Sequence, residues 1–569
     1  MGVGTTRTLE RVAAAMGVLD QATPCFESAD DIPNGGVLCA LPALLGLGLL
    51  RHAHAHFSLP KGFYPMESIL LLLAYLALGR VPSLEQLRYQ PPGEWGKLLG
   101  LDRIPEVKTL REKVGLLGDD AERTARWSTE LARDWMACDV QAAGVLLIDG
   151  HTRVYHGKLT KLPRRYVSRE RLCLRGTTDY WVNALDGQPF FCVTKPVDPG
   201  LQKTLEEEIV PRLLIDVPGQ PDEQTLAADP LRHRFILVFD REGYSPSLFQ
   251  RLKAQRIAIL TYHKHPGPDW SEGEFTPRQL THPNGEISTL RMAERGTRLS
   301  NGLWVRELRC LNEDGHQTSI LSTDYRSDLA TAAAAMFARW HQENFFKYMR
   351  QHYGLDRLVA QGTSPLPDTT RLVNPAWRAL DSQVRSCSGK LSRQQAAFAA
   401  GTLRPTDDNP AAAARHEQKQ GVMLQGVEAR QGELDALKAQ RKATPKHVEL
   451  QDLPHDQRFA QLRGARKHFV DTVKLIAYRA ETSLVQLVRE TLRRTDDARS
   501  FVRGLMQTTV NLRPDLARRE LRVEIHGQAN PIHDATVATL CAELNATETH
   551  YPGTELRLNY LPVRSSSFP

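Results

Sequence analysis

The chain has 569 residues, of which 41% are hydrophobic, 24% charged and 7% aromatic. This length predicts three or four folded units at roughly 150 residues each, and the composition excludes a disulfide-stapled miniprotein, a collagen-like fibre, a coiled-coil rod and wholesale disorder. The 73 Lys and Arg residues exceed the 66 Asp and Glu residues by only seven, so charge is informative where basic residues cluster.

The cysteines and apolar stretches predict a chain in a reducing, aqueous compartment. The eight cysteines are far apart and include no Cys-x-x-Cys pair, which argues against a disulfide framework and a thiolate zinc site. The stretches 36–50 and 69–79 are too short or too interrupted by Gly and Pro to span a bilayer, which takes about 20 residues. We expect them to be buried helices, and the start of the chain does not resemble a secretion signal. A cytoplasmic location and no membrane partner are therefore expected.

Residues 1–142 predict a helical N-terminal domain, because apolar residues recur there at helical spacing between Pro and Gly turns. In the stretch 105–114, Lys108, Arg111 and Lys113 point away from an apolar face. Such a short basic helix is either a DNA-recognition helix or plain scaffold. The domain is thus a candidate for binding DNA ends.

Residues 143–264 and 324–360 predict an α/β core, in which short apolar runs alternate with helical segments. We expect one buried strand over 144–148, ending at Asp149, and another over 234–239, ending at Asp240. The other expected strands are 180–183, 189–194 and 257–262, and the expected helices are 201–215, 245–255 and 328–352.

The stretch 265–323 is rich in Gly, Pro and alternating residues and predicts a β-rich insertion. Residues 361–569 predict a mostly helical C-terminal region, a candidate for DNA binding and dimerisation. Within it, 411–443 predicts a helical arm or hairpin, 459–508 one or two amphipathic helices, and 520–525 a short strand.

Three acidic residues carry the predicted chemistry. Asp149 and Asp240 each follow a strongly apolar strand, and strand ends of α/β sheets present ligand-binding groups. Glu343 lies on an expected helix, where Arg339, Lys347 and Arg350 share its polar stripe. Three converging carboxylates suit two Mg²⁺ or Mn²⁺ ions about 4 Å apart, with the three cations holding DNA phosphates.

Plainer roles exist for each of these acids. An Asp after a strand is often a turn or cap residue, and a Glu between cations on a helix is often part of a solvated ion-pair network. Glu242, two residues after Asp240, is the main substitute if one acid is misassigned. His151 and His156 beside Asp149 make a weaker zinc candidate.

A dense basic segment follows Asp149 directly. The stretch 151–175 holds eight basic residues and one acid, Glu170, a net charge of +7. This density suits a polyphosphate backbone. The basic residues, of which all but the last are predicted to contact DNA, are Arg153, Lys158, Lys161, Arg164, Arg165, Arg169, Arg171 and Arg175.

The order Asp149, Asp240, Glu343, with a β-rich stretch before the glutamate helix, resembles the DDE transposases of bacterial insertion sequences, in the branch with a Tyr-Arg-Glu-Lys signature. The signature spacing maps here to Met336, Arg339, Glu343 and Arg350. Arg and Glu match, whereas Met replaces Tyr and Arg replaces Lys. The resemblance covers about residues 144–358 and implies a ribonuclease-H-like catalytic core with a β insertion, flanked by helical domains.

The resemblance also implies an activity. Such an enzyme binds the terminal inverted repeats of its element as double-stranded DNA, nicks to free a 3′ hydroxyl, and uses that hydroxyl to attack target DNA. It implies that Asp149 contacts both metals, Asp240 one and Glu343 the other, that the enzyme is a homodimer on DNA, and that it works in the bacterial cytoplasm near the nucleoid. Two alternatives stay open: a structure-selective endonuclease without strand transfer, and a catalytically inactive, transposase-derived DNA-binding protein.

Overall fold

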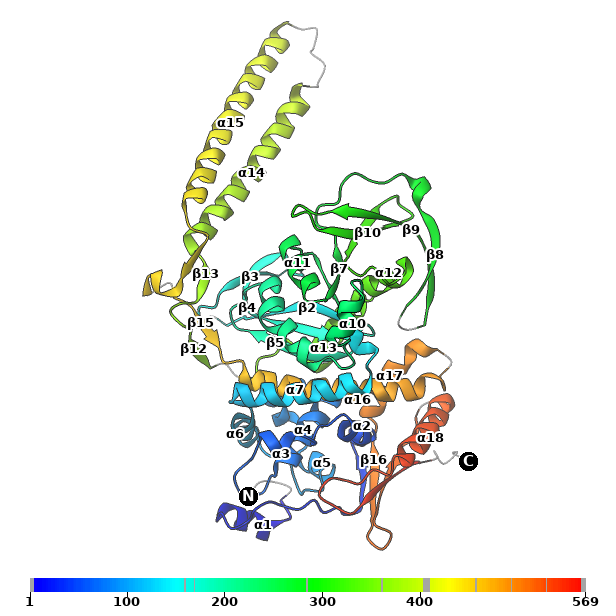
Figure 1. The fold of residues 1–569 in the computed structure, drawn as a ribbon. Helices are drawn as coiled ribbons and strands as arrows, with labels where there is room; N and C mark the ends of the chain where they lie inside the picture. Colours follow the sequence, from blue (N-terminus) through cyan, green and yellow to red (C-terminus); the bar gives the residue numbers. More distant parts are fainter. Residues whose placement is uncertain are drawn as a thin grey trace. The chain divides into compact units, whose positions relative to one another are not determined.

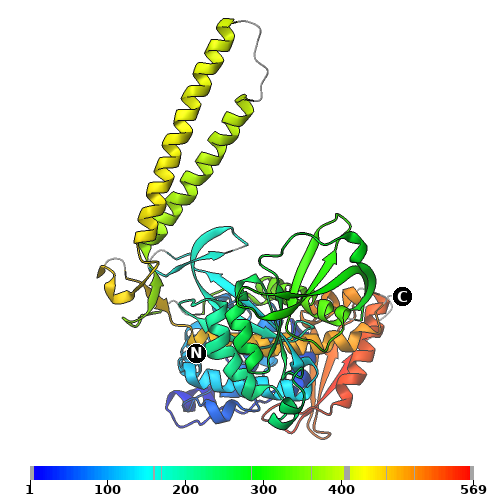
Figure 2. The same ribbon diagram turned by 45° about the horizontal axis from the view of Figure 1, so that its top comes forward.

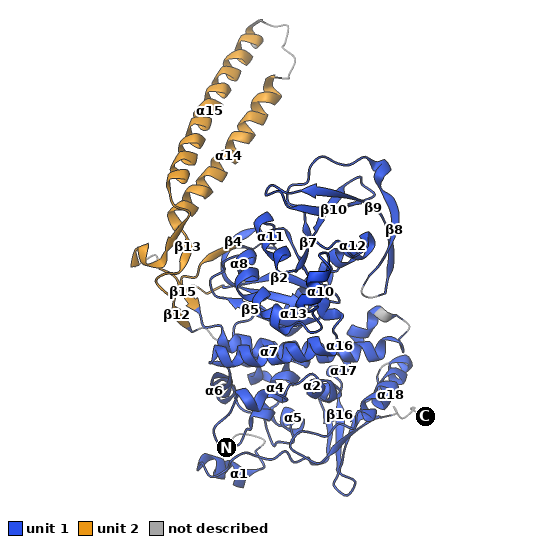
Figure 3. Cartoon of the chain, in the orientation of Figure 1, with its two compact units in different colours: residues 1–155, 166–362, 462–569 blue, residues 156–165, 363–461 orange. Residues whose placement is uncertain are grey.

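The computed structural model describes residues 5–157, 160–167, 169–282, 285–359, 362–402, 410–455, 458–492, 494–528 and 530–563. They form two units (Figure 3). Unit 1 comprises residues 1–155, 166–362 and 462–569, and unit 2 comprises 156–165 and 363–461. The N-terminal region, the predicted core and the last hundred residues thus share one unit.

The sheet that positions the candidate site lies in unit 1 (Figure 1). Its strand order runs β4-β2-β6-β7-β11-β10-β9-β8, and β5 pairs with β4. β2 is antiparallel to β4 and parallel to β6, which is parallel to β7. The first five strands are β2 (Val145–Val154), β4 (Leu172–Asn183), β5 (Pro189–Lys195), β6 (Ile236–Phe239) and β7 (Ala258–Tyr262), and β3 (Arg164–Val167) spans the boundary between the units.

Helices connect and cover these strands. Between β5 and β6 the chain forms α8 (Leu201–Thr204), a π-helical turn (Leu205–Ile209), α9 (Val210–Asp216) and α10 (Glu223–Ala228). α11 (Pro246–Ala254) joins β6 to β7, and Ser245 caps its first turn by accepting from the Leu248 amide. The parallel pairs β2–β6 and β6–β7 are buried along their length, as hydrophobic runs covered on both faces should be.

The stretch predicted to be a β-rich insertion forms four antiparallel strands. They extend the same sheet from β7 rather than building a separate one, because β11 pairs with β7. Two helices follow, and Asp328 caps the first by accepting from two backbone amides. The elements are β8 (Thr276–Thr281), β9 (Ile287–Arg298), β10 (Trp304–Leu311), β11 (Gln317–Ser322), α12 (Leu329–Phe337) and α13 (Arg339–Tyr353).

The N-terminal region is helical, as predicted, and packs against a helix from the far end of the chain. α16 (Ala465–Arg489) contacts α2, α4, α6 and α7, and it also contacts β5 of the sheet. Figure 1 shows α7 and α16 running side by side next to the sheet. The N-terminal helices are α1 (Thr8–Ala15), α2 (Leu41–Gly46), α3 (Ala53–His56), α4 (Met66–Leu78), α5 (Pro92–Lys97), α6 (Val107–Gly118) and α7 (Ala121–Cys138).

The two ends of the chain also share a small sheet, in the order β1-β16-β17-β18. β1 (Ala29–Ile32) pairs with β16, so Ile32 lies opposite Val510. The C-terminal elements are α17 (Ala498–Met506), β16 (Val510–Asp515), β17 (Glu520–Ile525), α18 (Pro531–Ala546) and β18 (Arg557–Pro562). The strand predicted at 520–525 is confirmed.

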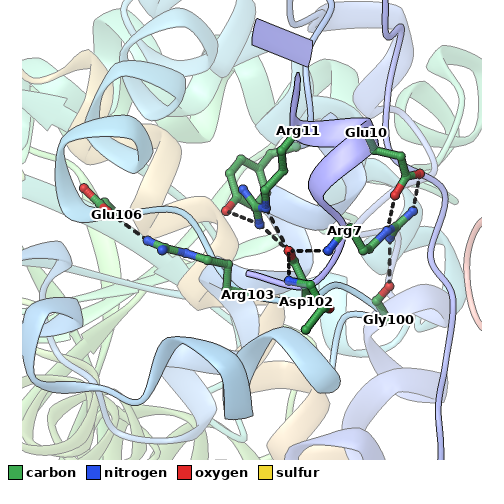
Figure 4. Close-up of polar contacts among 9 residues, drawn as sticks. Arg7, Glu10, Arg11, Gly100, Asp102, Arg103 and Glu106 are labelled. Carbon is green, nitrogen blue, oxygen red and sulfur yellow. Dashed lines mark hydrogen bonds and ion pairs between the residues drawn. The ribbon is translucent and has the colours of Figure 1, made fainter. Parts of the chain in front are cut away.

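Helix α1 is anchored by one buried carboxylate (Figure 4). Asp102 accepts hydrogen bonds from the backbone amides of Thr6 and Arg7, each at 3.2 Å, and forms an ion pair with Arg11. These donors lower the pKa of Asp102 although burial opposes them. The contacts hold the start of the chain against the loop after α5.

Unit 2 contains a helical hairpin, seen from two directions in Figures 1 and 2. The stretch 411–443, predicted to be a helical arm or hairpin, forms only the second of its two helices. α14 (Pro375–Thr402) packs along α15 (Pro410–Ala443) through a small core that includes Val384, Leu391 and Leu434. β13 (Arg371–Val373) pairs with β14 (His447–Glu449) at the base of the helices. The remaining strands of this region are β12 (Thr363–Pro365) and β15 (Ala460–Leu462).

Of the two apolar stretches predicted to be buried helices, 36–50 is only partly buried and exposes Gly46, whereas 69–79 is buried almost throughout. α4 covers the second, and a 3₁₀ turn over Gly35–Ala40 followed by α2 makes up most of the first. Across the described residues, no helix combines the length and apolarity needed to cross a bilayer.

Candidate active site

Two aspartates lie next to each other where the parallel pairing of β2 and β6 ends. Ile148 of β2 is in register with Phe239 of β6, and Asp149 and Asp240 are the next residues on their strands. Adjacent strands are about 4.8 Å apart. The two acids therefore occupy one edge of the parallel part of the sheet, as the sequence pattern predicts.

The strand β2 does not end at Asp149, which corrects the sequence prediction. It runs on to Val154 because β4 continues to pair with it, with Asp149 opposite Trp181 and Val154 opposite Gly176. An apolar run alone does not reveal this, since the continuation contains polar residues. What ends near Asp149 is the parallel pairing with β6.

The surroundings of Asp149 disfavour its charged form. Burial is the main cause that raises its pKa to about 7, the charges of Asp240 and Glu242 raise it further, and Arg339 opposes them. The side chain keeps 22% of its surface exposed, and one oxygen accepts from the Gly150 amide at 2.8 Å. An additional cation beside Asp149 would therefore favour its charged form.

Asp240 is held by the turn that follows β6. Its side chain accepts from the Glu242 amide at 2.8 Å and caps the 3₁₀ turn Arg241–Gly243. The Thr261 hydroxyl of β7 donates to the Asp240 carbonyl at 3.1 Å. The capping role was one of the plain alternatives for this residue, and it leaves the second carboxylate oxygen available for a ligand.

Helix α13 is tied to the strands beside these acids by one buried glutamine. The Gln342 amide donates to the carbonyls of Leu147 and Trp181 and to the side-chain oxygen of Asn183, at 3.3, 3.1 and 2.9 Å. Gln342 is fully buried. Because it precedes Glu343 directly, this anchor fixes where the predicted catalytic part of α13 lies on the sheet.

Arg339 and Glu343 sit one turn apart on α13 and face the same edge of the sheet. A guanidinium nitrogen of Arg339 lies 3.6 Å from a carboxylate oxygen of Asp149, and Arg339 is buried. Glu343 is exposed. Tyr262, which ends β7, has its pKa raised by burial, lowered by Arg339 and raised by Glu343, so both α13 residues lie near it.

The donor set of this edge suits a hard cation, since carboxylate oxygens are the ligands that Mg²⁺ and Mn²⁺ prefer. Within the described ranges, however, no three His, Cys, Asp or Glu side chains are arranged to hold a metal ion. The residues present therefore provide a carboxylate pair, Asp149 and Asp240, with Glu343 outside it and Arg339 supplying the neighbouring positive charge.

A further carboxylate, Asp356, contacts two of the cations predicted to bind DNA and one histidine. Asp356 accepts from His151 Nε2 at 2.6 Å and from Arg350 Nε at 3.0 Å, and Arg169 lies 3.7 Å away. Burial raises the pKa of Asp356, but the hydrogen bond from His151 and the nearby cations lower it to about 2 on balance. The His151 ring stacks on Phe346 at 5.1 Å.

Arg153 is not available for DNA, contrary to the sequence prediction. Its side chain is 4% exposed and pairs with Asp179 at 2.8 Å, and Asp471 of α16 lies 3.9 Å away. These partners hold its guanidinium inside the unit. A phosphate could not reach it without unfolding this region.

The other predicted phosphate contacts differ in their surroundings. Lys347 and Arg171 are exposed, and Arg350 and Arg169 keep 41% and 26% of their side-chain surface open. Lys161, Arg164 and Arg165 belong to unit 2, where Lys161 and Arg164 are exposed and Arg165 is half-buried. Lys158 lies outside the described residues.

Three residues of this region were not predicted: Gln342, Asp356 and Tyr262. For Tyr262 a signal existed, because it is the last residue of the strand next to β6, just as Asp240 is the first residue after β6. Asp356 follows the glycine that ends α13, Gly354 with φ +59°, and nothing in its neighbourhood in sequence indicates its partners.

Comparison with known proteins gives a family. A search of curated proteins finds no match. A family model described as "Transposase protein" matches residues 2–564, which is nearly the whole chain. The chain therefore belongs to this transposase family.

Proposed function

We propose that the chain is a DDE transposase, in which Asp149, Asp240 and Glu343 are the catalytic acids. The proposal rests on the membership of the transposase family and on one observation: the register that places Asp149 beside Asp240 at the end of a parallel strand pair. Asp149 and Asp240 are far apart in sequence, so their meeting at the ends of adjacent parallel strands supports a shared catalytic site more strongly than either acid alone.

The strand order supports a ribonuclease-H-like core. The arrangement β5-β4-β2-β6-β7, with three antiparallel strands followed by two parallel ones, is the topology that the sequence resemblance implies. Asp149 then lies on the first strand of the core and Asp240 after the fourth. The strands β8 to β11 lie between the fifth core strand and α13, where a β insertion is expected.

In this proposal Asp149 and Asp240 would hold Mg²⁺ or Mn²⁺, and Glu343, which is exposed on α13, would complete the binding site for two ions. Such ions would supply, when bound, activation of the oxygen nucleophile and neutralisation of the charge on the oxygen that leaves phosphorus. The chain itself positions the DNA: Lys347 and Arg350 lie on the same helix as Glu343 and can contact phosphates flanking the scissile bond. Arg339 offsets the charge of Asp149.

The reaction needs no covalent enzyme intermediate. A water oxygen attacks the phosphorus at an element end and the 3′ oxygen leaves with a proton. That 3′ hydroxyl then attacks a phosphorus of target DNA, forming one phosphodiester bond as another breaks. The substrates are double-stranded terminal repeats and target DNA, and two copies of the chain would hold the paired ends.

The test uses single amide substitutions in the full chain. Asp149→Asn, Asp240→Asn and Glu343→Gln are each expected to lower Mg²⁺-dependent nicking of end-containing DNA by at least a hundredfold while end binding stays within about threefold. Glu242→Gln is the matched control, because Glu242 is the competing acid beside Asp240, and it should retain nicking. A fully active Glu343→Gln enzyme combined with an inactive Glu242→Gln enzyme would reassign the third acid.

Two observations favour the inactive, DNA-binding alternative. Arg339 already offsets the negative charge of Asp149. In the part of the chain that the structure describes, no three His, Cys, Asp or Glu side chains are arranged to bind a metal ion. Calorimetric titration separates the possibilities: Mg²⁺ or Mn²⁺ uptake that Asp149→Asn removes supports the enzyme. Absent uptake and absent cleavage on bound ends support the binding protein. Joining of a labelled 3′ hydroxyl end to plasmid separates a transposase from an endonuclease without strand transfer.

A further inference from the structure

Helix α13 ends in a turn that brings Asp356 back beside the helix. Gly354, with φ +59°, ends the helix, and a side chain there would meet both the carbonyl oxygen and the Cβ of Pro82 at 2.9 Å. The turn therefore depends on a glycine, which adopts this left-handed conformation without a steric cost. It places Asp356 against Arg350 in the last turn of α13, and Arg350 Nε donates to Asp356 Oδ2 at 3.0 Å.

The other oxygen of Asp356 is held from the sheet. His151 Nε2 of β2 donates to Asp356 Oδ1 at 2.6 Å, and His151 is only 5% exposed. The His151 ring also stacks on Phe346 of α13, with the ring centroids 5.1 Å apart. Because a strand and a helix together hold this histidine, its hydrogen bond fixes the carboxylate and leaves Oδ2 for other partners.

Two arginines from distant segments share Asp356 Oδ2. Arg350 Nε is 3.0 Å from this oxygen, and a terminal nitrogen of Arg169 is 3.7 Å from it. Arg169 Nε also lies 3.6 Å from Glu170. Among the residues that the structure describes, neither terminal nitrogen of Arg350 has a hydrogen-bond partner, and its side chain is 41% exposed. The two guanidiniums are thus gathered on one oxygen, with donors left for a ligand.

The charge of Asp356 permits this gathering. Two guanidiniums close together repel each other, and a carboxylate in contact with both offsets that repulsion. Although burial raises the pKa of Asp356, the hydrogen bond from His151 and the nearby arginines lower it to about 2. The carboxylate therefore stays charged at neutral pH, where DNA carries its full phosphate charge.

The arrangement lies along the same strand and helix as the proposed catalytic acids. His151 is two residues beyond Asp149 on β2, and side chains two residues apart point to the same face of a strand. Arg350 is two helical turns beyond Glu343 on α13 and so shares its face. At about 3.3 Å per strand residue and about 1.5 Å per helix residue, these offsets correspond to a few nucleotides of about 3.4 Å rise.

We propose that Asp356 is a positioning residue that holds Arg350 and Arg169 as a joint clamp on a single DNA phosphate, a few nucleotides from the scissile bond. The inference rests on the proposed function for its substrate and adds the residue that orients the contact. Arginines that are free of each other can choose among several phosphates. Arginines gathered on one carboxylate oxygen can reach the same phosphate, each with charge-assisted hydrogen bonds.

A positioning acid and a merely repulsive acid predict opposite results. If Asp356 only repels phosphates, removing its charge strengthens DNA binding. If it orients the clamp, removing its charge weakens binding, because the two guanidiniums lose the geometry in which they meet one phosphate. Asp356→Asn keeps the size of the side chain and an oxygen that can accept from His151, so the variant is expected to fold.

The experiment scans a terminal-repeat duplex with methylphosphonates, each of which makes one phosphate neutral, and measures binding to the full chain by fluorescence anisotropy without divalent metal. We expect one position at which neutralisation weakens wild-type binding at least fivefold. At that position, and at no other, Arg350→Gln, Arg169→Gln and Asp356→Asn should each bind the neutral and the natural duplex within twofold. Asp119→Asn, which removes an exposed acid paired with Arg466, is the matched control and should keep the wild-type map.

Each other result has a definite meaning. The clamp is overturned if Arg350→Gln and Arg169→Gln lose sensitivity at different phosphates, if Asp356→Asn binds more tightly than wild type, or if the wild-type map has no sensitive position. The two arginine variants change exposed side chains, so they test the shared phosphate independently of Asp356→Asn. Because the scan needs no Mg²⁺, a chain that shows the shared position but never nicks DNA would refute the proposed catalysis and leave the clamp standing. Nicking without a shared position would do the reverse.

Discussion

Arg339 places a guanidinium nitrogen 3.6 Å from a carboxylate oxygen of Asp149. The contact joins the helix that carries Glu343 to the strand that carries the first predicted acid. The guanidinium of Arg339 also offsets the negative charge of Asp149. Two consequences can be tested, one on stability and one on the coupling between these residues.

Arg339→Gln is expected to destabilise the chain by about 1–3 kcal/mol, because it leaves Asp149 beside Asp240 without a compensating cation. The figure lies at or below the low end of the range for broken buried pairs, since the Arg339 and Asp149 atoms are 3.6 Å apart and the acid is 22% exposed. Urea unfolding in the presence of a chelator at pH 8 measures the change.

The matching double variant shows whether the two residues are coupled. With Asp149→Asn the carboxylate charge is gone, so adding Arg339→Gln should then destabilise by less than it does alone, with a coupling energy of about 1 kcal/mol or more. Strict additivity of the two substitutions would mean that the contact contributes nothing.

The basic segment separates into exposed and buried members, and salt dependence of DNA binding should distinguish them. Arg164→Gln and Arg171→Gln remove exposed charges and, if both contact phosphates, should together lower the slope of log affinity against log salt by about 1.8 units. Arg153→Gln should leave the slope unchanged, because that guanidinium is buried with Asp179. Fluorescence anisotropy with labelled terminal repeats across a salt series provides the measurement.

The free energy of unfolding of Arg153→Gln provides a control for its DNA-binding measurement. Removing this guanidinium leaves Asp179, which is 1% exposed, without its ion pair, so the free energy of unfolding should fall by about 3 kcal/mol. Unchanged stability together with a reduced salt slope for Arg153→Gln would place its side chain at the DNA instead.

Much of the fold follows from local pattern. The apolar runs before Asp149 and Asp240 predicted two buried strands, and the structure pairs these strands with Ile148 in register with Phe239. The helical N-terminal region and the strand Glu520–Ile525 likewise follow from periodicity of 3.6 and 2 residues. Such features depend on which residues must face a core.

Features that depend on distant partners did not follow from the sequence. The basic segment looks like a uniform phosphate-binding stretch, yet Arg153 is buried because Asp179 and Asp471 meet it from β4 and α16. In the same way, α16 packs against α4 and β1 pairs with β16, so the last hundred residues join the N-terminal region in one unit. No local pattern encodes such pairings between the two ends of a chain.

A buried glutamate on α16 should be among the most sensitive positions in unit 1. Glu481 accepts hydrogen bonds from the hydroxyls of Tyr348 and Tyr353 on α13 and pairs with Arg80 at 2.9 Å. Its carboxylate is fully buried. Glu481→Gln leaves Arg80 and the nearby Arg499 without a counter-charge, and about 3–5 kcal/mol of stability should be lost.

The pH dependence of the same group has a definite sign. Burial raises the pKa of Glu481, but Arg80, Arg499 and the tyrosine hydroxyls lower it on balance below its usual value. The folded state therefore holds its proton less tightly than the unfolded state. The stabilisation by Glu481 is present above the ordinary glutamate pKa and is lost as the pH falls below it. Urea unfolding of wild type and Glu481→Gln should converge toward pH 3, and a constant difference from pH 3 to 8 would contradict this assignment.

Lys474 gives the opposite pattern, because burial lowers its pKa in the folded chain to about 7, well below the ordinary lysine value of 10.5. Between these values the unfolded chain binds more protons than the folded chain, so the contribution of Lys474 to stability rises with pH. The penalty is fully present below pH 7 and disappears toward pH 10.5. Lys474→Met should therefore stabilise the chain most at pH 6, by at most about 5 kcal/mol at 1.36 kcal/mol per pKa unit.

The groups that act on Lys474 are Lys467, Asp471, Arg357 and Arg153, and of these only Asp471 favours its charge. Urea unfolding at pH 6 and pH 9.5 compares wild type, Lys474→Met and the exposed control Lys264→Met. The difference between Lys474→Met and wild type should shrink by more than half at pH 9.5, whereas Lys264→Met should follow wild type at both values. A gain that does not change with pH would attribute the effect to packing of the methionine, and a loss of stability at pH 6 would show that the ammonium is well paired in solution.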